Sequence, residues 1–154
     1  MIYTLGIYLY AFAAIIASFF SKKIRKRVYG IGQTFRLLHR HIKPTDRVAW
    51  FHAASLGEFE QGRPLMERLR IERPEYKILL TFFSPSGYEV RKDYEGADLV
   101  CYIPFDTLGN VSSFIRLAHP EIAIFIKYEF WTNFLKALRK RGTKVYSISS
   151  IFRA

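Results

Sequence analysis

The chain of 154 residues is long enough for one domain with a sizeable hydrophobic core. Half of its residues are hydrophobic and 17% are aromatic, which excludes an intrinsically disordered protein. Lys and Arg number 24 against 13 Asp and Glu, and the single cysteine excludes an intrachain disulfide and a cysteine metal cluster. Cys101 is therefore predicted to be a small buried hydrophobic residue.

Residues 1–21 carry no charged side chain, and the basic run K-K-I-R-K-R follows them. A cleaved signal peptide would place its basic residues before the apolar run. A membrane-spanning helix needs about 20 apolar residues, so we predict an uncleaved anchor at 1–21, with the rest of the chain in the cytoplasm by the positive-inside rule. The alternative is an amphipathic helix lying in the interface, because Tyr3, Tyr8 and Tyr10 could share one face.

Residues 22–47 hold nine basic side chains and one acid, Asp46. Next to an apolar stretch, this basic segment is predicted to lie beside the membrane and to meet anionic lipid headgroups rather than nucleic acid. Gly30-Ile31-Gly32 half-resembles a dinucleotide-binding fingerprint, but no strand precedes it and Phe35 stands at the position of the third glycine. A turn is predicted there instead.

From residue 48 onward, short apolar runs alternate with helical stretches. This alternation predicts a parallel sheet covered by helices on both faces, which is a Rossmann-like α/β fold. Pro64 conflicts with a straight first helix. The predicted strands are 48–52, 77–82, 99–103, 121–126 and 144–149, and the predicted helices are 58–72, 86–94, 107–118 and 131–141.

Ligands of such sheets bind outside the carboxyl ends of the strands. The segments that follow the first four predicted strands contain small, hydroxyl-bearing and acidic residues and one lysine: H-A-A-S-L-G-E, S-P-S-G, P-F-D and K-Y-E-F-W. Helices that begin there offer free N–H groups to an anion or a sugar oxygen. The pattern predicts a binding site at this edge, and the sequence has no Walker A, His-Glu-x-x-His or Asp-x-Asp motif.

Glu58 in the first of these segments has two interpretations. Ser55 and Glu58 stand three residues apart, which is the spacing of a helix capping box. A carboxylate at a helix N-terminus also stays ionised, which suits a general base. The two roles could coexist.

Four motifs in this order, W-F-H-A-A-S-L-G-E-F, T-F-F-S-P-S-G, Y-I-P-F-D and E-F-W-T-N, resemble the 3-deoxy-D-manno-octulosonic acid (Kdo) transferases. The resemblance runs from about Tyr8 to the end, and Thr132 departs from it where many relatives have proline. It implies a GT-B glycosyltransferase that transfers Kdo from CMP-Kdo to the lipid A precursor at the cytoplasmic face of the inner membrane. Residues 48–154 would be its Rossmann-like acceptor-binding domain, with the donor domain absent from this chain.

The resemblance also implies roles for single residues. Glu58 would be the general base, and Glu129 would stabilise the transition state. The expected partners are CMP-Kdo, the lipid A precursor and membrane lipids, with no cofactor and no metal. The alternative is a non-catalytic, membrane-tethered Rossmann-like binding module. Acceptor binding is expected at Ser55, Gly57, Ser84, Ser86, Gly87 and Lys127.

Overall fold

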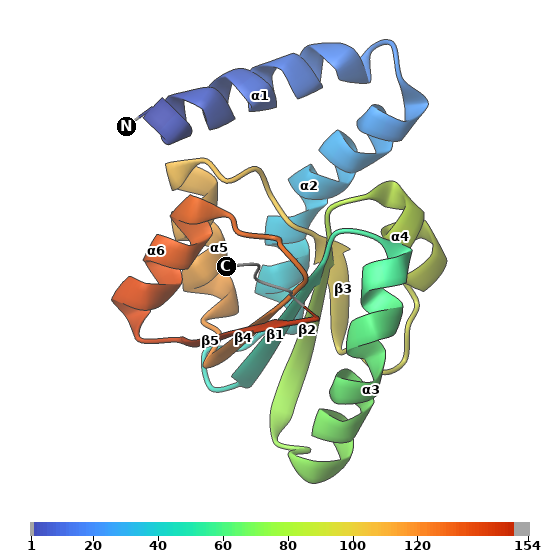
Figure 1. Ribbon diagram of the computed structural model, residues 1–154, viewed down its shortest axis with the longest axis vertical. Coiled ribbons are helices and arrows are strands. Elements are labelled where there is room, and N and C mark those ends of the chain that lie inside the picture. Colours follow the sequence, from blue (N-terminus) through green and yellow to red (C-terminus); the bar gives the residue numbers. More distant parts are fainter. Residues whose placement is uncertain (1, 150–154) are drawn as a thin grey trace.

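The computed structural model describes residues 2–149, which form one sheet with helices on both faces and a further helix across one end (Figure 1). The five strands have the order β3-β2-β1-β4-β5, and all neighbours are parallel. This confirms the predicted α/β, Rossmann-like class. The strands are β1 (Arg47–Ala53), β2 (Tyr76–Phe82), β3 (Leu99–Tyr102), β4 (Ile122–Ile126) and β5 (Lys144–Ile148), and the helices are α1 (Ile2–Ser18), α2 (Lys22–His41), α3 (Leu56–Glu72), α4 (Pro85–Arg91), α5 (Leu108–Ala118) and α6 (Thr132–Arg141).

Every predicted strand is present, and its ends differ from the prediction by no more than one residue. The strands were easy to locate because both faces of the sheet are buried, so their side chains form continuous apolar runs. On one face Trp50, Leu79 and Phe125 pack against α2, α5 and α6. On the other face Phe51 and Leu80 pack against α3 and α4. Figure 1 shows these two helices together on one side of the sheet.

Cys101 lies in the first of these two core clusters, as predicted. Its side chain is buried. Burial raises the pKa of the Cys101 thiol to about 12, because the thiolate would lose its hydration. The cysteine is therefore an inert packing residue.

The basic segment forms α2, and the prediction of a turn at 30–35 is wrong. The helix continues through both glycines because a buried stripe with helical spacing, formed by Arg27, Ile31, Thr34 and Leu38, packs on the domain. Thr34 Oγ1 donates a hydrogen bond to the carbonyl of Tyr102, 2.8 Å away. The carboxyl-terminal half of α2 thus belongs to the core of the domain, while contact of the basic side chains with lipid stays a prediction.

Gly30 has a packing function in α2. A Cβ atom at this position would lie 2.3 Å from Cδ2 of the buried Tyr102 ring. A Cβ atom at Gly32, on the same helix, would meet nothing within 4 Å. The first glycine therefore permits α2 to approach β3 closely, which explains why the fingerprint-like spacing has no ligand-binding meaning here.

Helix α1 crosses the end of the sheet where the strands finish (Figure 1). Tyr3 Oη donates a hydrogen bond to Asp106 Oδ2 at 2.6 Å, and Ala11 and Ala14 are buried against the domain. The opposite side of α1 leaves large apolar side chains exposed, among them Leu5, Leu9, Phe12, Ile15 and Ile16.

The membrane anchor at 1–21 stays a prediction. Among residues 2–149 no single helix is both long and apolar enough to cross a membrane. The pair α1 and α2 reaches the required length and composition together, but it is bent by 119° where the two helices join.

Candidate functional site

The loops that follow β1 and β4 form the point where the strand order reverses. From β1 the chain proceeds to β2 and β3 on one side, whereas β4 pairs with the other side of β1. Helix α3 then covers one face of the sheet and α6 the other. Ligands of open parallel sheets bind in the crevice that opens at such a point, which we call the switch point of the sheet.

Glu58 lies in the first turn of α3, directly after β1, and is half-buried. Its backbone N–H donates to Ser55 Oγ at 3.5 Å, and its Oε2 accepts a hydrogen bond from the N–H of Ala54 at 2.6 Å. The Ser55 half of the predicted capping box is therefore present, whereas the Glu58 carboxylate binds the N–H of Ala54 in place of that of Ser55. This backbone bond uses one of the two carboxylate oxygens, and the other has no hydrogen-bond partner in the β1 loop that the structure describes.

Glu129 lies in the loop between β4 and α6, and its side chain is 22% exposed. Its Oε2 accepts a hydrogen bond from Trp131 Nε1 at 3.1 Å and lies 3.4 Å from Nε2 of His52. Since His52 and Ala54 stand two positions apart at the end of β1, the structure brings Glu58 and Glu129 to the same strand end.

His52 is a site residue that sequence reasoning quoted within a motif but left without a role. The ring is fully buried, and its Nδ1 lies 2.9 Å from Thr81 Oγ1. The same hydroxyl accepts a hydrogen bond from Trp50 Nε1 at 2.8 Å. The sequence did contain a signal for His52, because a histidine inside an otherwise apolar strand is a buried polar side chain that requires partners.

The loop after β2 carries the predicted hydroxyls. Ser84 is half-buried and its N–H donates to the carbonyl of Ala54, which joins this loop to the β1 loop. Ser84 Oγ lies 2.9 Å from Ser86 Oγ, and Ser86 is exposed. The hydroxyls of both serines thus stand together at the same edge of the sheet, beside the β1 loop.

The two predicted glycines differ in their surroundings. Gly57 is exposed in the first turn of α3. Gly87 is buried, and a Cβ atom there would lie 2.4 Å from the Phe82 ring and 3.1 Å from the backbone nitrogen of Leu56. Gly87 therefore allows α4 to approach the β1 loop, so it shapes the site through backbone packing.

Lys127 directly follows β4 and is half-buried. Its φ of 61° lies in the left-handed region, which a residue with a side chain adopts at a cost of about 1–2 kcal/mol. Its N–H donates to Ile148 and its carbonyl accepts from Ser147 Oγ, so β5 holds this turn. The turn directs the chain away from β4 and into the Glu129 loop.

Asp106, the third acid at this edge, has a structural role. Its two carboxylate oxygens accept hydrogen bonds from the backbone N–H groups of Asn133 and Phe134 in the first turn of α6. Burial raises the pKa of Asp106, and the Asp106 contact together with burial raises the pKa of Tyr3 to about 12. The carboxylate caps α6 and joins it to α1, which fixes the end of the Glu129 loop.

Aromatic side chains connect the site to α2. The rings of Phe83 and Trp131 stack with centroids 5.4 Å apart, and the guanidinium of Arg27 lies 3.9 Å from the centroid of Phe83. Sequence reasoning counted Arg27 only as part of a basic run. Within residues 2–149 no group of three His, Cys, Asp or Glu side chains converges as metal ligands would.

A family model described as 3-deoxy-D-manno-octulosonic-acid transferase (kdotransferase) matches residues 25–154. The chain belongs to this family. Among proteins named 3-deoxy-D-manno-octulosonic acid transferase, it is 32% identical to that of Chlamydia trachomatis serovar D over 110 residues, covering 70% of this chain and 26% of that protein. The Aquifex aeolicus protein is 34% identical over 95 residues, covering 61% of this chain and 26% of that protein.

The Haemophilus influenzae protein of the same name is 30% identical over 100 residues, covering 64% of this chain. In each of these Kdo transferases the match extends over about a quarter of the relative's own length, between 23% and 26%. The family match extends over α2 and the whole sheet, and therefore over both carboxylates at the switch point.

Proposed function

We propose that this chain is the acceptor-binding part of a GT-B glycosyltransferase that transfers Kdo from CMP-Kdo to the lipid A precursor. One observation carries the proposal. In a member of the Kdo transferase family, Glu58 and Glu129 both lie at the carboxyl end of β1. The donor domain would belong to a part of the protein outside these 154 residues.

In this mechanism the carboxylate of Glu58 removes the proton from the attacking hydroxyl of the acceptor. The oxygen attacks the anomeric carbon of Kdo, the bond from that carbon to the CMP phosphate breaks, and CMP leaves with the bonding electrons. Attack opposite the leaving group inverts the anomeric configuration. The carboxylate would help most late in the reaction, when the hydroxyl proton has become acidic.

Glu129 would stabilise the positive charge that develops on the sugar ring as the bond to CMP breaks. A carboxylate does this best when it is held in place before the reaction begins. The hydrogen bond from Trp131 and the contact with the buried His52 supply that restraint. No step in this scheme requires a metal ion.

The acceptor would bind along the same edge. The hydroxyls of Ser55, Ser84 and Ser86 can bond to sugar oxygens, and Lys127 would meet a phosphate of the lipid. The exposed Gly57 leaves room beside the first turn of α3. Gly87 would contribute through the packing of α4.

The exposed apolar side of α1 supports attachment to the cytoplasmic face of the inner membrane. Its other side is held to the domain through Tyr3 and Tyr10, which favours a helix lying in the interface over one that leaves the domain to span the bilayer. In this position α1 would keep the carboxyl edge of the sheet near the lipid acceptor.

The deciding experiment is transfer of labelled Kdo from CMP-Kdo to a lipid A precursor by the full-length gene product. Formation of a labelled, Kdo-bearing lipid supports the proposal. Binding of the acceptor without any transfer, by a full-length product that is folded and carries both carboxylates, would favour the alternative of a membrane-tethered binding module.

A further inference from the structure

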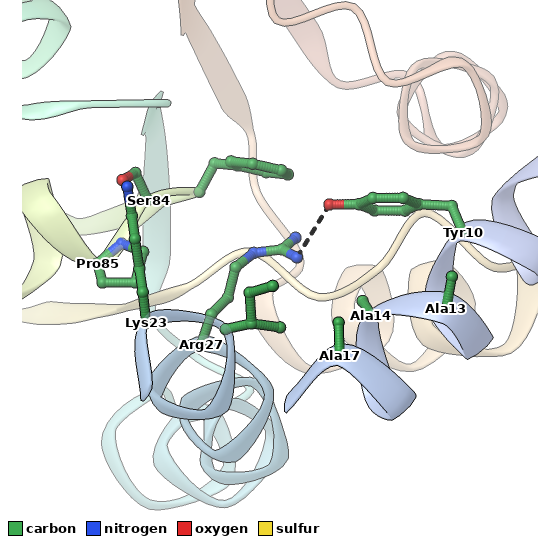
Figure 2. Close-up of a pocket in the computed structure, with 10 residues that line it drawn as sticks. Tyr10, Ala13, Ala14, Ala17, Lys23, Arg27, Ser84 and Pro85 are labelled. Carbon is green, nitrogen blue, oxygen red and sulfur yellow. Dashed lines mark hydrogen bonds between the residues drawn. The ribbon is translucent and has the colours of Figure 1, made fainter. Parts of the chain in front are cut away.

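A cavity of about 380 Å³ opens where α1, α2 and the loop after β2 meet. Its walls are largely apolar, with Ala13, Ala14 and Ala17 of α1 on one side and Pro85 on the other (Figure 2). Phe83 also lines it. Its volume lies within the range of about 300–1,000 Å³ that small-molecule sites occupy.

Arg27 places a positive charge in this apolar cavity. The residue is only 7% exposed, and its guanidinium extends toward Tyr10, whose Oη accepts a hydrogen bond from Nη1 at 3.3 Å (Figure 2). The rings of Phe83 and Phe105 lie 3.9 and 4.7 Å from the guanidinium carbon. These contacts hold the group in place without neutralising it.

The charge of Arg27 has no acidic partner among residues 2–149, and its Nε atom is buried without a hydrogen bond. Burial lowers the pKa of Arg27, but arginine stays protonated in proteins. An isolated buried cation is costly unless a counter-charge accompanies it. Lys23 adds a second, exposed positive charge at the mouth of the cavity.

We infer that this cavity binds the phosphate group and the adjoining acyl chain of a membrane lipid. Arg27 lines the cavity and carries a planar guanidinium, whose donors fit phosphate oxygens in pairs. The alanine wall and Phe83 accept the first carbons of the chain. The inference concerns lipid binding and does not rest on sugar transfer.

The position of the cavity agrees with this occupant. One wall of the cavity is α1, the helix whose other side exposes large apolar side chains. Through Phe83 it also adjoins Trp131 and hence the Glu129 loop. A lipid bound here would hold α1, α2 and the candidate site in a fixed relation.

The test measures binding of hexyl phosphate to the 154-residue chain by isothermal titration calorimetry. Inorganic phosphate and hexanol are measured separately, as probes for the phosphate and for the hydrocarbon chain. Hexyl phosphate should bind more tightly than either half-probe. Arg27→Gln should weaken it about 10–100-fold, the range expected for losing charge-assisted hydrogen bonds to an anion. Arg36→Gln removes the same charge from an exposed position on the same helix and should change affinity by less than about twofold.

A second variant covers the case in which Arg27→Gln does not fold. Ala17→Leu narrows the cavity at its apolar wall and keeps the arginine. It should weaken the binding of hexyl phosphate more than that of inorganic phosphate. Equal affinities for hexyl phosphate and inorganic phosphate would overturn the assignment to a lipid. Absence of hexyl phosphate binding, or equal losses in the Arg27 and Arg36 variants, would overturn the site itself.

Discussion

Glu58 takes part in the hydrogen bonds that begin α3, and its role as general base stays a proposal. Its N–H donates to Ser55 Oγ, which caps α3, and its carboxylate accepts the N–H of Ala54, so the residue is part of the capping structure. The same bonds hold the carboxylate at the switch point of the sheet. If Glu58 is the base, this restraint would favour catalysis, because the carboxylate would need no further ordering when the acceptor binds.

Replacing Glu58 by glutamine separates the two roles. The amide oxygen can still accept the N–H of Ala54, so the melting temperature should change little. If Glu58 is the base, kcat of the full-length enzyme should fall by about 10²–10⁴-fold. Ser55→Ala is the control: it should cost about 1 kcal/mol of stability with a smaller effect on kcat. A Glu58→Gln enzyme with normal kcat would leave the residue with its capping role alone.

His52 is expected to act on catalysis by positioning Glu129. In His52→Leu, Trp50 and Thr81 keep their mutual hydrogen bond, so the core should tolerate the change. Loss of the restraint on Glu129 should lower kcat by about 10–10²-fold, since small misplacements of reacting groups are costly. KM for the acceptor should stay nearly constant. A parallel rise in KM with constant kcat would show instead that His52 serves acceptor binding.

At the scale of the elements, the approach of α2 to β3 depends on one glycine. Gly30→Ala would place a methyl group 2.3 Å from the buried Tyr102 ring, and such overpacking costs about 1–3 kcal/mol. Gly32→Ala on the same helix meets open space and should stabilise the protein by up to about 1 kcal/mol through helix propensity. Urea denaturation of both variants measures the difference, and equal stabilities would contradict the packing seen in the structure.

Helix α1 is expected to contact lipid through its exposed apolar side. A double variant, Leu9→Glu and Phe12→Glu, keeps the buried alanines of the helix in place. Losing the insertion of two large apolar side chains should weaken membrane binding by about 3–6 kcal/mol. Co-sedimentation with anionic vesicles at high salt measures it, because salt removes the electrostatic contribution of the basic segment. Undiminished binding at high salt would refute the role of α1.

At the scale of the whole molecule, the proposal makes this chain one side of a reaction site. The chain matches about a quarter of the length of its relatives. Glu58 and Glu129 lie at the carboxyl end of β1. We expect the isolated 154-residue chain to transfer no Kdo, because catalysis requires donor and acceptor to be held in contact. The same assay with the full-length gene product is the positive control. Turnover by the isolated chain would contradict the assigned division between donor and acceptor parts.

Several features of this protein follow from the amino-acid sequence by itself. The strands could be located because burial on both faces of the sheet makes each of them a continuous apolar run. The capping of α3 follows from Ser55 and Glu58, whose spacing is local. The motifs that led to Glu58 and Glu129 are also short segments, and the family match extends over both.

Other features depend on contacts between distant parts of the chain. His52 and Glu129 are 77 positions apart, and Tyr3 and Asp106 are 103 apart. The glycines of α2 predict a turn by local preference, but the helix persists because its apolar stripe packs on the sheet. Local patterns report which face of a segment is apolar, whereas the partner of a buried polar or charged group is chosen only when the strands assemble. Tertiary structure therefore decided the surroundings of His52, Asp106 and Arg27.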